Sequence, residues 1–261
     1  MIKFSYYPEC PRTRREAEAL AAEGIPVDII CLRKDSEPKR EVVNGVRVYR
    51  LPIQRKRRGK LRYMFQYIGF SLLAALTVSF LYMRRRYKII HIHNMPDVLV
   101  FSALLPRLCG ASIILDLHDP MPEVFMAKYA IDKTHLMVRL LLVMEKWCIR
   151  FSDLVLTANI AFRDHFISRG CPPDKIHIIM NSPQESIFHK TAKGGNQLIG
   201  DSNGRFHIMY HGTIVERNGI SVALEAIAKA RQKIPDLSFE VYGEGDFVDR
   251  FLDMVNQLNL K

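Results

Sequence analysis

Short continuous runs of hydrophobic residues alternate along the chain with amphipathic stretches. A continuous apolar run of about four to eight residues is typical of a parallel strand whose two faces are both buried. Apolar positions three and four residues apart predict the helices that cover such a sheet. The predicted strands cover residues 2–7, 27–32, 88–93, 112–117, 154–157, 176–180, 206–210 and 238–242. The predicted helices cover residues 11–24, 98–108, 134–151, 162–168, 220–234 and 247–258.

The order of these elements predicts an α/β fold with a doubly wound, Rossmann-like parallel sheet. Segment 44–53 indicates a turn followed by an edge-like strand, because Val46, Val48 and Leu51 alternate with basic residues. A proline-rich loop is expected to follow Asp119. The apolar positions of the helix at 134–151 include Leu136, Leu140, Val143 and Trp147.

Domain boundaries follow from a change in composition. Residues 190–204 are polar and glycine-rich, which is typical of a linker. We expect an N-terminal Rossmann-like domain at 1–185, a linker at 186–205 and an incomplete second Rossmann-like domain at 206–261. About 55 residues of two strands and two helices cannot bury their apolar surface alone, and a partial parallel sheet leaves an unpaired edge. The second domain is therefore expected to pack on something else, to be completed by a partner chain, or to belong to a longer chain.

Polar side chains gather where two neighbouring strands end. These groups are His93, Asn94 and Asp97 after one strand and His118, Asp119 and Glu123 after the next. In open parallel sheets, ligands bind beyond the carboxyl ends of the strands, because helix N-termini and loops converge there. This placement is the best functional indication in the sequence.

Residues two positions apart in a strand point to the same face of the sheet. His91 and His93 therefore share one face, and so do Asp116 and His118. Two histidines without a third clustered ligand are a weak metal site, so His91 is interpreted as a core or cleft histidine. Asp116 is interpreted as structural and His118 as functional, while His93 fits either role.

Residues 50–90 contain eleven Lys or Arg residues and no Asp or Glu, although the formal net charge of the whole chain is only +11. Within this block, residues 63–83 carry no charge, which is long enough to span a bilayer. Both flanks are basic, however, and the strands on either side belong to one predicted sheet. A membrane span is thus disfavoured against a buried crossover helix or a helix lying in the membrane interface. We expect peripheral attachment to an anionic membrane, on its cytoplasmic inner face.

Several classes of protein are disfavoured by what the sequence lacks. The five cysteines show no paired spacing for zinc or disulfides, and the N-terminus lacks the apolar core of a signal peptide. No G-x-G-x-x-G follows the first strand, and there is no Walker lysine loop. No D-x-D pair is present to bring a metal to a diphosphate, so no metal and no cofactor are expected. The basic block lacks a nucleic-acid recognition module, so nucleic acid is not an expected partner.

Six motifs occur in a familiar order at the predicted strand ends. They are PRTRREAEAL, HIHNMPDVLVFSALL, LDLHDPMPE, the Asn-Ser-Pro strand end, YHGTIVERNG and YGEGD. In this order the chain resembles the family-four retaining glycosyltransferases. These enzymes have the GT-B fold, in which two Rossmann-like domains face a cleft. The resemblance implies a truncated start of the second, nucleotide-sugar-binding domain.

The resemblance also implies roles for particular residues. His118, with Asp119, would lie beside the transferred sugar. The residues implied on the acceptor side of the cleft are Arg12, Arg14, Arg15, His93, Asn94 and Glu123. The residues implied to hold the donor are Gly212, Thr213, Arg217, Gly243 and Gly245. Two features depart from the family: Asn218 stands where a lysine is usual, and the paired glutamates that grip the donor would lie beyond Lys261.

The function implied is hexosyl transfer from a nucleotide sugar to a lipid-linked or polysaccharide acceptor, in the synthesis of cell-surface polysaccharide or glycolipid. By analogy with the family, the anomeric configuration would be retained, and the leaving phosphate would take the acceptor's proton. The alternative is a non-catalytic half-enzyme that docks on the membrane and needs a partner chain for donor binding. Binding of a nucleotide sugar to residues 1–261 discriminates between them.

Overall fold

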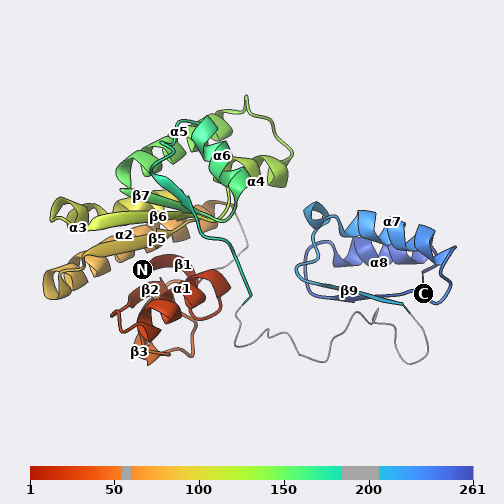
Figure 1. Ribbon diagram of the computed structural model, residues 1–261, viewed down its shortest axis with the longest axis horizontal. Coiled ribbons are helices and arrows are strands. Elements are labelled where there is room, and N and C mark those ends of the chain that lie inside the picture. Colours follow the sequence, from red (N-terminus) through yellow and green to blue (C-terminus); the bar gives the residue numbers. More distant parts are fainter. Residues whose placement is uncertain (55–59, 184–205, 261) are drawn as a thin grey trace. The chain divides into compact units, whose positions relative to one another are not determined.

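The computed structural model describes residues 1–54, 60–183 and 206–260, and it divides the chain into two compact units (Figure 1). The units are Met1–Gln184 and Glu185–Lys261. The linker expected at 186–205 lies outside the described residues.

The first unit is built on an eight-stranded sheet in the order β3-β4-β2-β1-β5-β6-β7-β8. All neighbouring strands are parallel except β3 and β4. Strand order reverses direction beside β1, which is the mark of a doubly wound fold. The strands are β1 Ile2–Tyr6, β2 Asp28–Leu32, β3 Arg40–Val43, β4 Val46–Leu51, β5 Ile89–His93, β6 Ser112–Leu117, β7 Leu154–Thr157 and β8 Ile176–Ile178.

Helices cover both faces of this sheet. Alternate residues of β2 point to opposite faces: Ile29 packs in a cluster with Ala17 of α1, and Ile30 packs in a larger cluster with Phe70 of α2. The larger cluster also holds residues of η1, α5 and α6, so these helices lie on the α2 side. The helical elements are α1 Pro11–Ala22, α2 Lys60–Arg85, η1 Asp97–Ala103, α3 Leu104–Leu108, α4 Met121–Tyr129, α5 Leu136–Phe151 and α6 Ile160–Ser168.

The structure corrects the interpretation of segment 44–53. β4 is not the edge of the sheet, because it lies between β2 and an additional antiparallel strand, β3. The two strands form a hairpin whose turn is Asn44-Gly45, with φ of 48° and 80°. Positive φ at both central residues is the type I′ geometry that Asn-Gly favours. β3 therefore supplies the edge strand.

The expectation of a proline-rich loop after Asp119 is also wrong, because helix α4 begins at Met121. Pro122 lies in its first turn, where a proline costs no hydrogen bond, because the first amides of a helix have no intrahelical acceptor.

The uncharged stretch at 63–83 forms most of α2, which connects β4 to β5 of the same sheet. Among the described residues, Phe65–Arg85 is the one helical segment long and apolar enough to cross a membrane. One side of this helix is part of the core, with Phe70, Ala74 and Val78 buried against the sheet. Crossing a bilayer would remove that side from the core. α2 is therefore a crossover helix with one buried side.

In the second unit, the described residues 206–260 form two parallel strands and two α-helices (Figure 1). Its core joins Ile214, Leu224 and Phe251. Met209 and Tyr242 of its strands are 62% and 57% exposed, so the two-stranded sheet is covered incompletely. The elements are β9 His207–His211, η2 Glu216–Asn218, α7 Ile220–Arg231, β10 Ser238–Tyr242 and α8 Val248–Gln257.

Candidate functional site

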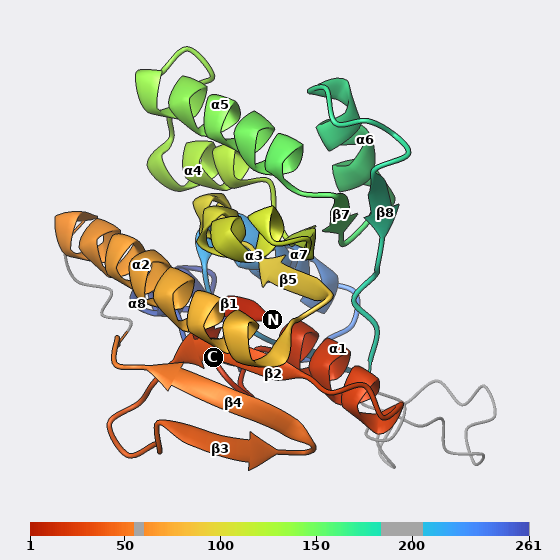
Figure 2. The same ribbon diagram turned by 90° about the vertical axis from the view of Figure 1, so that its left-hand side faces the viewer.

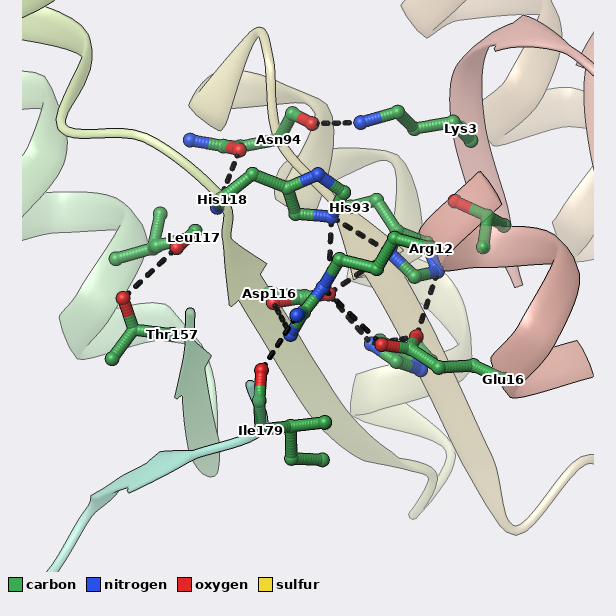
Figure 3. Close-up of polar contacts among 12 residues, drawn as sticks. Lys3, Arg12, Glu16, His93, Asn94, Asp116, Leu117, His118, Thr157 and Ile179 are labelled. Carbon is green, nitrogen blue, oxygen red and sulfur yellow. Dashed lines mark hydrogen bonds and ion pairs between the residues drawn. The ribbon is translucent and has the colours of Figure 1, made fainter. Parts of the chain in front are cut away.

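The carboxyl ends of β5 and β6 bring a group of polar residues together, as the sequence predicts. His93 and Asp116 are direct neighbours across these strands, and the Asn94 amide donates to the Asp116 carbonyl at 2.9 Å. Helix α1 runs over the same face and contributes Arg12 and Glu16 (Figure 3). The result is a buried network of charged and titratable side chains at one end of the sheet.

Asp116 is the centre of this network, although the sequence suggested only a structural role for it. Its side chain is fully buried. Arg12 binds both carboxylate oxygens, with Nε at 2.7 Å from Oδ2 and Nη2 at 2.8 Å from Oδ1. The Nδ1 atom of His93 and the Nε2 atom of His118 each lie 3.1 Å from Oδ2. Three groups thus converge on one carboxylate oxygen (Figure 3).

Hydrogen bonding keeps the Asp116 carboxylate ionised despite its burial. Burial alone would raise the pKa of Asp116, but hydrogen bonds from His118, His93 and Arg12 outweigh it and lower the pKa. The guanidinium supplies the compensating positive charge in a fixed, two-pronged geometry. Without it, the carboxylate would be an unpaired buried charge.

Arg12 also joins α1 to the segment after β8. Its Nη1 atom donates to the carbonyl of Ile179 at 2.6 Å and lies 3.3 Å from Asn181 Oδ1. Arg15 donates to the same Asn181 oxygen at 3.2 Å. Arg14 is half-buried, and its Nε is one of the buried polar atoms without a hydrogen-bond partner in the described part of the chain. The expected arginine cluster thus includes one buried member, Arg12, which holds Asp116.

The three histidines of the site are all kept neutral by burial. Burial lowers the pKa of His91 to about 4, and it lowers the pKa values of His93 and His118 as well. His118 differs from the other two because its side chain is 18% exposed. Its Nε2 faces Asp116, and its Nδ1 has no hydrogen-bond partner among the described residues. If Nε2–H donates to Asp116, then Nδ1 is an acceptor available to a ligand.

Asn94 holds the backbone on which His118 stands. Its Oδ1 accepts the His118 amide at 2.9 Å, and its Nδ2 donates to the Asp119 carbonyl at 2.9 Å. Lys3 in turn donates to the Asn94 carbonyl. Asn94 is buried, whereas Asp119 is exposed. Asn94 therefore positions the His118 loop, and the Asp119 side chain is open to solvent.

Glu16 completes the network and was not singled out by the sequence. Its Oε2 lies 3.8 Å from His93 Nε2 and 3.9 Å from His91 Nε2. Both carboxylate oxygens and both Nε2 atoms are buried without a hydrogen-bond partner in the described structure. Burial, with the neighbouring Asp116 charge, raises the pKa of Glu16 to about 7. The spacing that places residue 16 one turn after Arg12 on α1 could have indicated it.

The donor atoms of Glu16, His91, His93 and Asp116 all lie within 4.8 Å of one another, a geometry that could hold a metal ion. Arg12 argues against this use, because its Nε lies 2.7 Å from Asp116 and 3.2 Å from Glu16. A divalent cation would have to displace or face that guanidinium. Because the pKa of Glu16 is raised to about 7, a proton on its carboxyl group can offset the negative charge of the cluster without a metal ion.

Glu123 belongs to a different group of side chains. Its Oε1 lies 2.9 Å from His165 Nε2 and also accepts from Arg169, which binds Glu145 as well. Hydrogen bonds from Arg169 and His165 lower the pKa of Glu123 against the opposing effect of burial. These contacts join α4 to α5 and α6. The structure does not bring the Glu123 carboxylate into contact with His118.

In the second unit, the five predicted donor-binding residues follow β9 and β10. A Cβ on Gly243 would lie 1.8 Å from the Gly212 carbonyl oxygen, and one on Gly245 would lie 1.9 Å from the Ile214 carbonyl oxygen. The glycines thus let two loops touch. Thr213 accepts from Asn218 through its carbonyl at 2.9 Å, and Arg217 is exposed in η2.

Comparison with solved structures shows where this architecture occurs. Sucrose-phosphate synthase from Thermosynechococcus elongatus matches 95% of the chain with a TM-score of 0.70 and 19% identity. Anabaena HepE in complex with UDP-glucose matches 100% with a TM-score of 0.65 and 14% identity. The lipopolysaccharide outer core galactosyltransferase WaaB matches 99% with a TM-score of 0.60 and 10% identity. The chain covers 62%, 65% and 64% of these three proteins, respectively.

No curated protein sequence matches the chain. The glycosyl transferase 4-like domain family, however, matches residues 11–182, which include α1, the β5 and β6 ends and the segment after β8. The chain therefore belongs to the glycosyl transferase 4-like family and has a GT-B-type fold, as the motifs at its strand ends predict.

Proposed function

We propose that this glycosyltransferase moves a hexosyl group from a nucleoside-diphosphate sugar to a lipid-linked or polysaccharide acceptor, with retention of configuration and without an essential metal. The observation that carries the proposal is His118: a neutral, partly exposed histidine at a strand end, held by Asp116 through Nε2 and open at Nδ1. Two solved structures of similar fold support the donor and acceptor classes: HepE was solved with UDP-glucose, and WaaB is named for transfer to lipopolysaccharide.

The chemistry requires a group that orients the sugar and a site that stabilises the departing diphosphate. A neutral imidazole acceptor can hold a sugar hydroxyl without competing with the diphosphate for charge. We assign that role to His118, which positions and polarises rather than attacks. Asp119, Asn94 and His93 support it from the same strand ends. The leaving phosphate itself takes the proton from the acceptor hydroxyl.

The diphosphate is assigned to the loops of the second unit. Arg217 is exposed in η2, and α7 begins directly after Gly219, whose φ of 74° turns the chain into the helix. The N-terminus of a helix favours anions, because its first amides lack acceptors and its dipole is positive there. Arg217 and the amides following Gly212 and Gly219 would together stabilise the negative charge that develops on the leaving group.

The test of this assignment is a screen of nucleotide sugars. The full-length protein is incubated with UDP-, GDP- and ADP-hexoses and a membrane extract from its own cells, and release of nucleoside diphosphate is measured with and without a chelator. Release with one donor, dependent on the extract and unaffected by the chelator, is the expected result. No release with any donor contradicts the assignment, and loss of activity with the chelator contradicts metal-free transfer.

The half-enzyme alternative has one observation in its favour, the exposed Met209 and Tyr242 on the sheet of the second unit. Calorimetric titration of UDP-glucose into residues 1–261 distinguishes the two functions. Binding that weakens on changing Arg217 to Gln supports a donor site within this chain. Absence of binding to residues 1–261, together with binding after a partner chain is added, supports the half-enzyme.

A further inference from the structure

The outward side of α2 is as apolar as its buried side. Phe65, Leu72, Leu76 and Met83 are 65%, 62%, 69% and 65% exposed. Their spacings of seven, four and seven residues place them along one line of a helix with about 3.6 residues per turn. The buried residues Phe70, Ala74, Val78 and Leu81 lie on the opposite side of the same helix. α2 thus presents an apolar stripe to solvent and another to the core.

Helix α5 repeats this arrangement. Leu136, Leu140, Val143 and Trp147 are 78%, 50%, 51% and 63% exposed, with spacings of four, three and four residues. The buried residues of α5 lie opposite them and include Val138, Leu141 and Cys148. The positions that make this helix apolar in the sequence are therefore mainly solvent-facing. Burial in the core does not account for them.

The two helices that carry these stripes cover the same side of the sheet. η1 packs against both α2 and α5, α3 also packs against α2, and all lie on the same side of the sheet (Figure 2). α3, which packs against α2 and reaches the end of α5 through Arg107 and Phe151, adds the exposed Leu104, Leu105 and Leu108. The outward sides of α2, α3 and α5 form what we call the three-helix face. Soluble monomers rarely expose so many neighbouring large apolar side chains without a partner.

The charges of the three-helix face have one sign. The exposed charged residues on the outward side of α2 and α5 are basic, namely Arg84, Arg139, Lys146 and Arg150. Arg85 points to the sheet side instead, where it pairs with Asp28 of β2. The only acidic residue of these helices is Glu145, which is 1% exposed. Arg107 of α3 pairs with Asp153 at 2.9 Å. Within the described residues of α2, α3 and α5, no acidic side chain is exposed.

We propose that the three-helix face docks on an anionic lipid bilayer and lies in its interface without crossing it. Leu, Phe and Trp side chains enter the acyl region at such an interface, while Arg and Lys reach back to the headgroups. A second copy of the chain fits less well, because its like-charged Arg139 and Lys146 would meet these same residues. α2 cannot cross the membrane while its buried side packs against the sheet as part of the core. This inference concerns attachment and does not rest on the proposed sugar transfer.

Trp147 is the only tryptophan of the chain, so its fluorescence reports on this face alone. The protein is mixed with vesicles of phosphatidylcholine, with or without phosphatidylglycerol. A blue shift and protection from an aqueous quencher are expected with the anionic vesicles, and both should weaken in high salt. An emission spectrum unchanged by anionic vesicles overturns the proposal.

Variants locate the binding. Leu72→Glu combined with Leu76→Glu is expected to reduce co-sedimentation with anionic vesicles at least tenfold, and circular dichroism checks that the helix content is retained. Val222→Glu is the matched control, since Val222 is 67% exposed on α7 of the other unit, and it should bind as the wild type does. The proposal is overturned if both variants lose vesicle binding equally, or if neither variant loses it.

Two further outcomes would show that the three-helix face does not lie in the interface of a bilayer. Resistance of the membrane-bound protein to extraction by alkaline carbonate would show that α2 spans the membrane. A dimer in lipid-free solution that the Leu72→Glu, Leu76→Glu variant dissociates, with vesicle binding unchanged, would show that a second copy covers the face. Because no nucleotide sugar is present, failure of these binding experiments leaves the sugar-transfer proposal standing.

Discussion

At the scale of single residues, the site depends on one buried carboxylate. Asp116 receives Arg12, His93 and His118 in a region from which water is excluded. In such surroundings an ion pair is not a large net source of stability, but removing one partner leaves an uncompensated charge. The pair therefore fixes the geometry of the site: Asp116 holds the His118 ring, and Arg12 keeps Asp116 ionised.

Arg12→Gln is predicted to lower the free energy of unfolding by about 3–5 kcal/mol, because it leaves Asp116 buried without its cation. Arg107→Gln is the matched control, since Arg107 pairs with Asp153 at 2.9 Å in a more exposed place, and it should cost no more than about 1 kcal/mol. Urea denaturation measures both. Equal effects of the two substitutions would show that the buried pair has no special weight.

Glu16 makes the stability of this site dependent on pH. Its folded pKa of about 7 lies above the usual value of 4.5, so the folded state holds a proton that the unfolded state loses as the pH rises between these values. Stability from this group therefore falls as pH rises from 4.5 to 7. His91, with its pKa lowered from 6.5 to about 4, acts in the opposite direction between these two pH values, because there the unfolded state holds the extra proton.

Glu16→Gln removes the Glu16 contribution and leaves that of His91. The melting temperature of the variant relative to wild type is predicted to increase from pH 4.5 to pH 8, with a change of about 1–3 kcal/mol in relative stability. Thermal unfolding at several pH values measures it. A difference that stays constant with pH would mean that Glu16 titrates normally.

At the scale of elements, the hydrophobic pattern of the sequence predicts the parallel strands of the sheet. The elements that it does not predict, β3 and α4, have physical reasons for escaping it. The apolar runs at 88–93 and 112–117 correspond to β5 and β6, because burial on both faces leaves a continuous signal. β3 was missed because its REVV sequence is short and half-exposed. α4 was missed because Pro120 and Pro122 suggest a loop, although the first turn of a helix accepts proline.

The loops of the second unit give a prediction at this scale. Gly245→Ala places a Cβ 1.9 Å from the Ile214 carbonyl, so the two loops must separate. We expect a loss of about 1–3 kcal/mol and faster hydrogen exchange in α8. Gly69→Ala is the control. Gly69 lies within α2, and a Cβ added there would contact the Ile53 side chain at 3.6 Å, which is an ordinary van der Waals distance. Because alanine favours a helix more than glycine does, this substitution should stabilise the protein by about 0.5–1 kcal/mol. Unchanged exchange in Gly245→Ala would contradict the close contact.

The candidate site could be predicted only in part. The clusters after β5 and β6 were visible because parallel strands share one carboxyl end. The central position of Asp116 in the network was not visible. It depends on α1 crossing the sheet, which brings Arg12 to Asp116 although the two residues are over a hundred positions apart. Sequence spacing carries no signal for such a contact. The exposed stripes of α2 and α5 were likewise hidden, since periodicity does not tell which apolar side faces the core.

At the scale of the whole molecule, the features of the proposed transfer are shared between two units. The first unit carries the preformed His118 network and the three-helix face, and the second carries the loops after β9 and β10. The network is complete within the first unit, so its geometry does not wait for a ligand. We infer that this network holds His118 in place for sugar transfer.

Turnover of the full-length protein with its nucleotide sugar and acceptor tests this role of His118. His118→Ala is predicted to lower kcat about a hundredfold or more, while the melting temperature stays close to that of the wild type, because the side chain is partly exposed. His177→Ala, which removes an exposed histidine of β8, should leave kcat unchanged. If the kcat of His118→Ala lies within a few-fold of the wild-type value, His118 does not orient the sugar and the buried network serves another purpose.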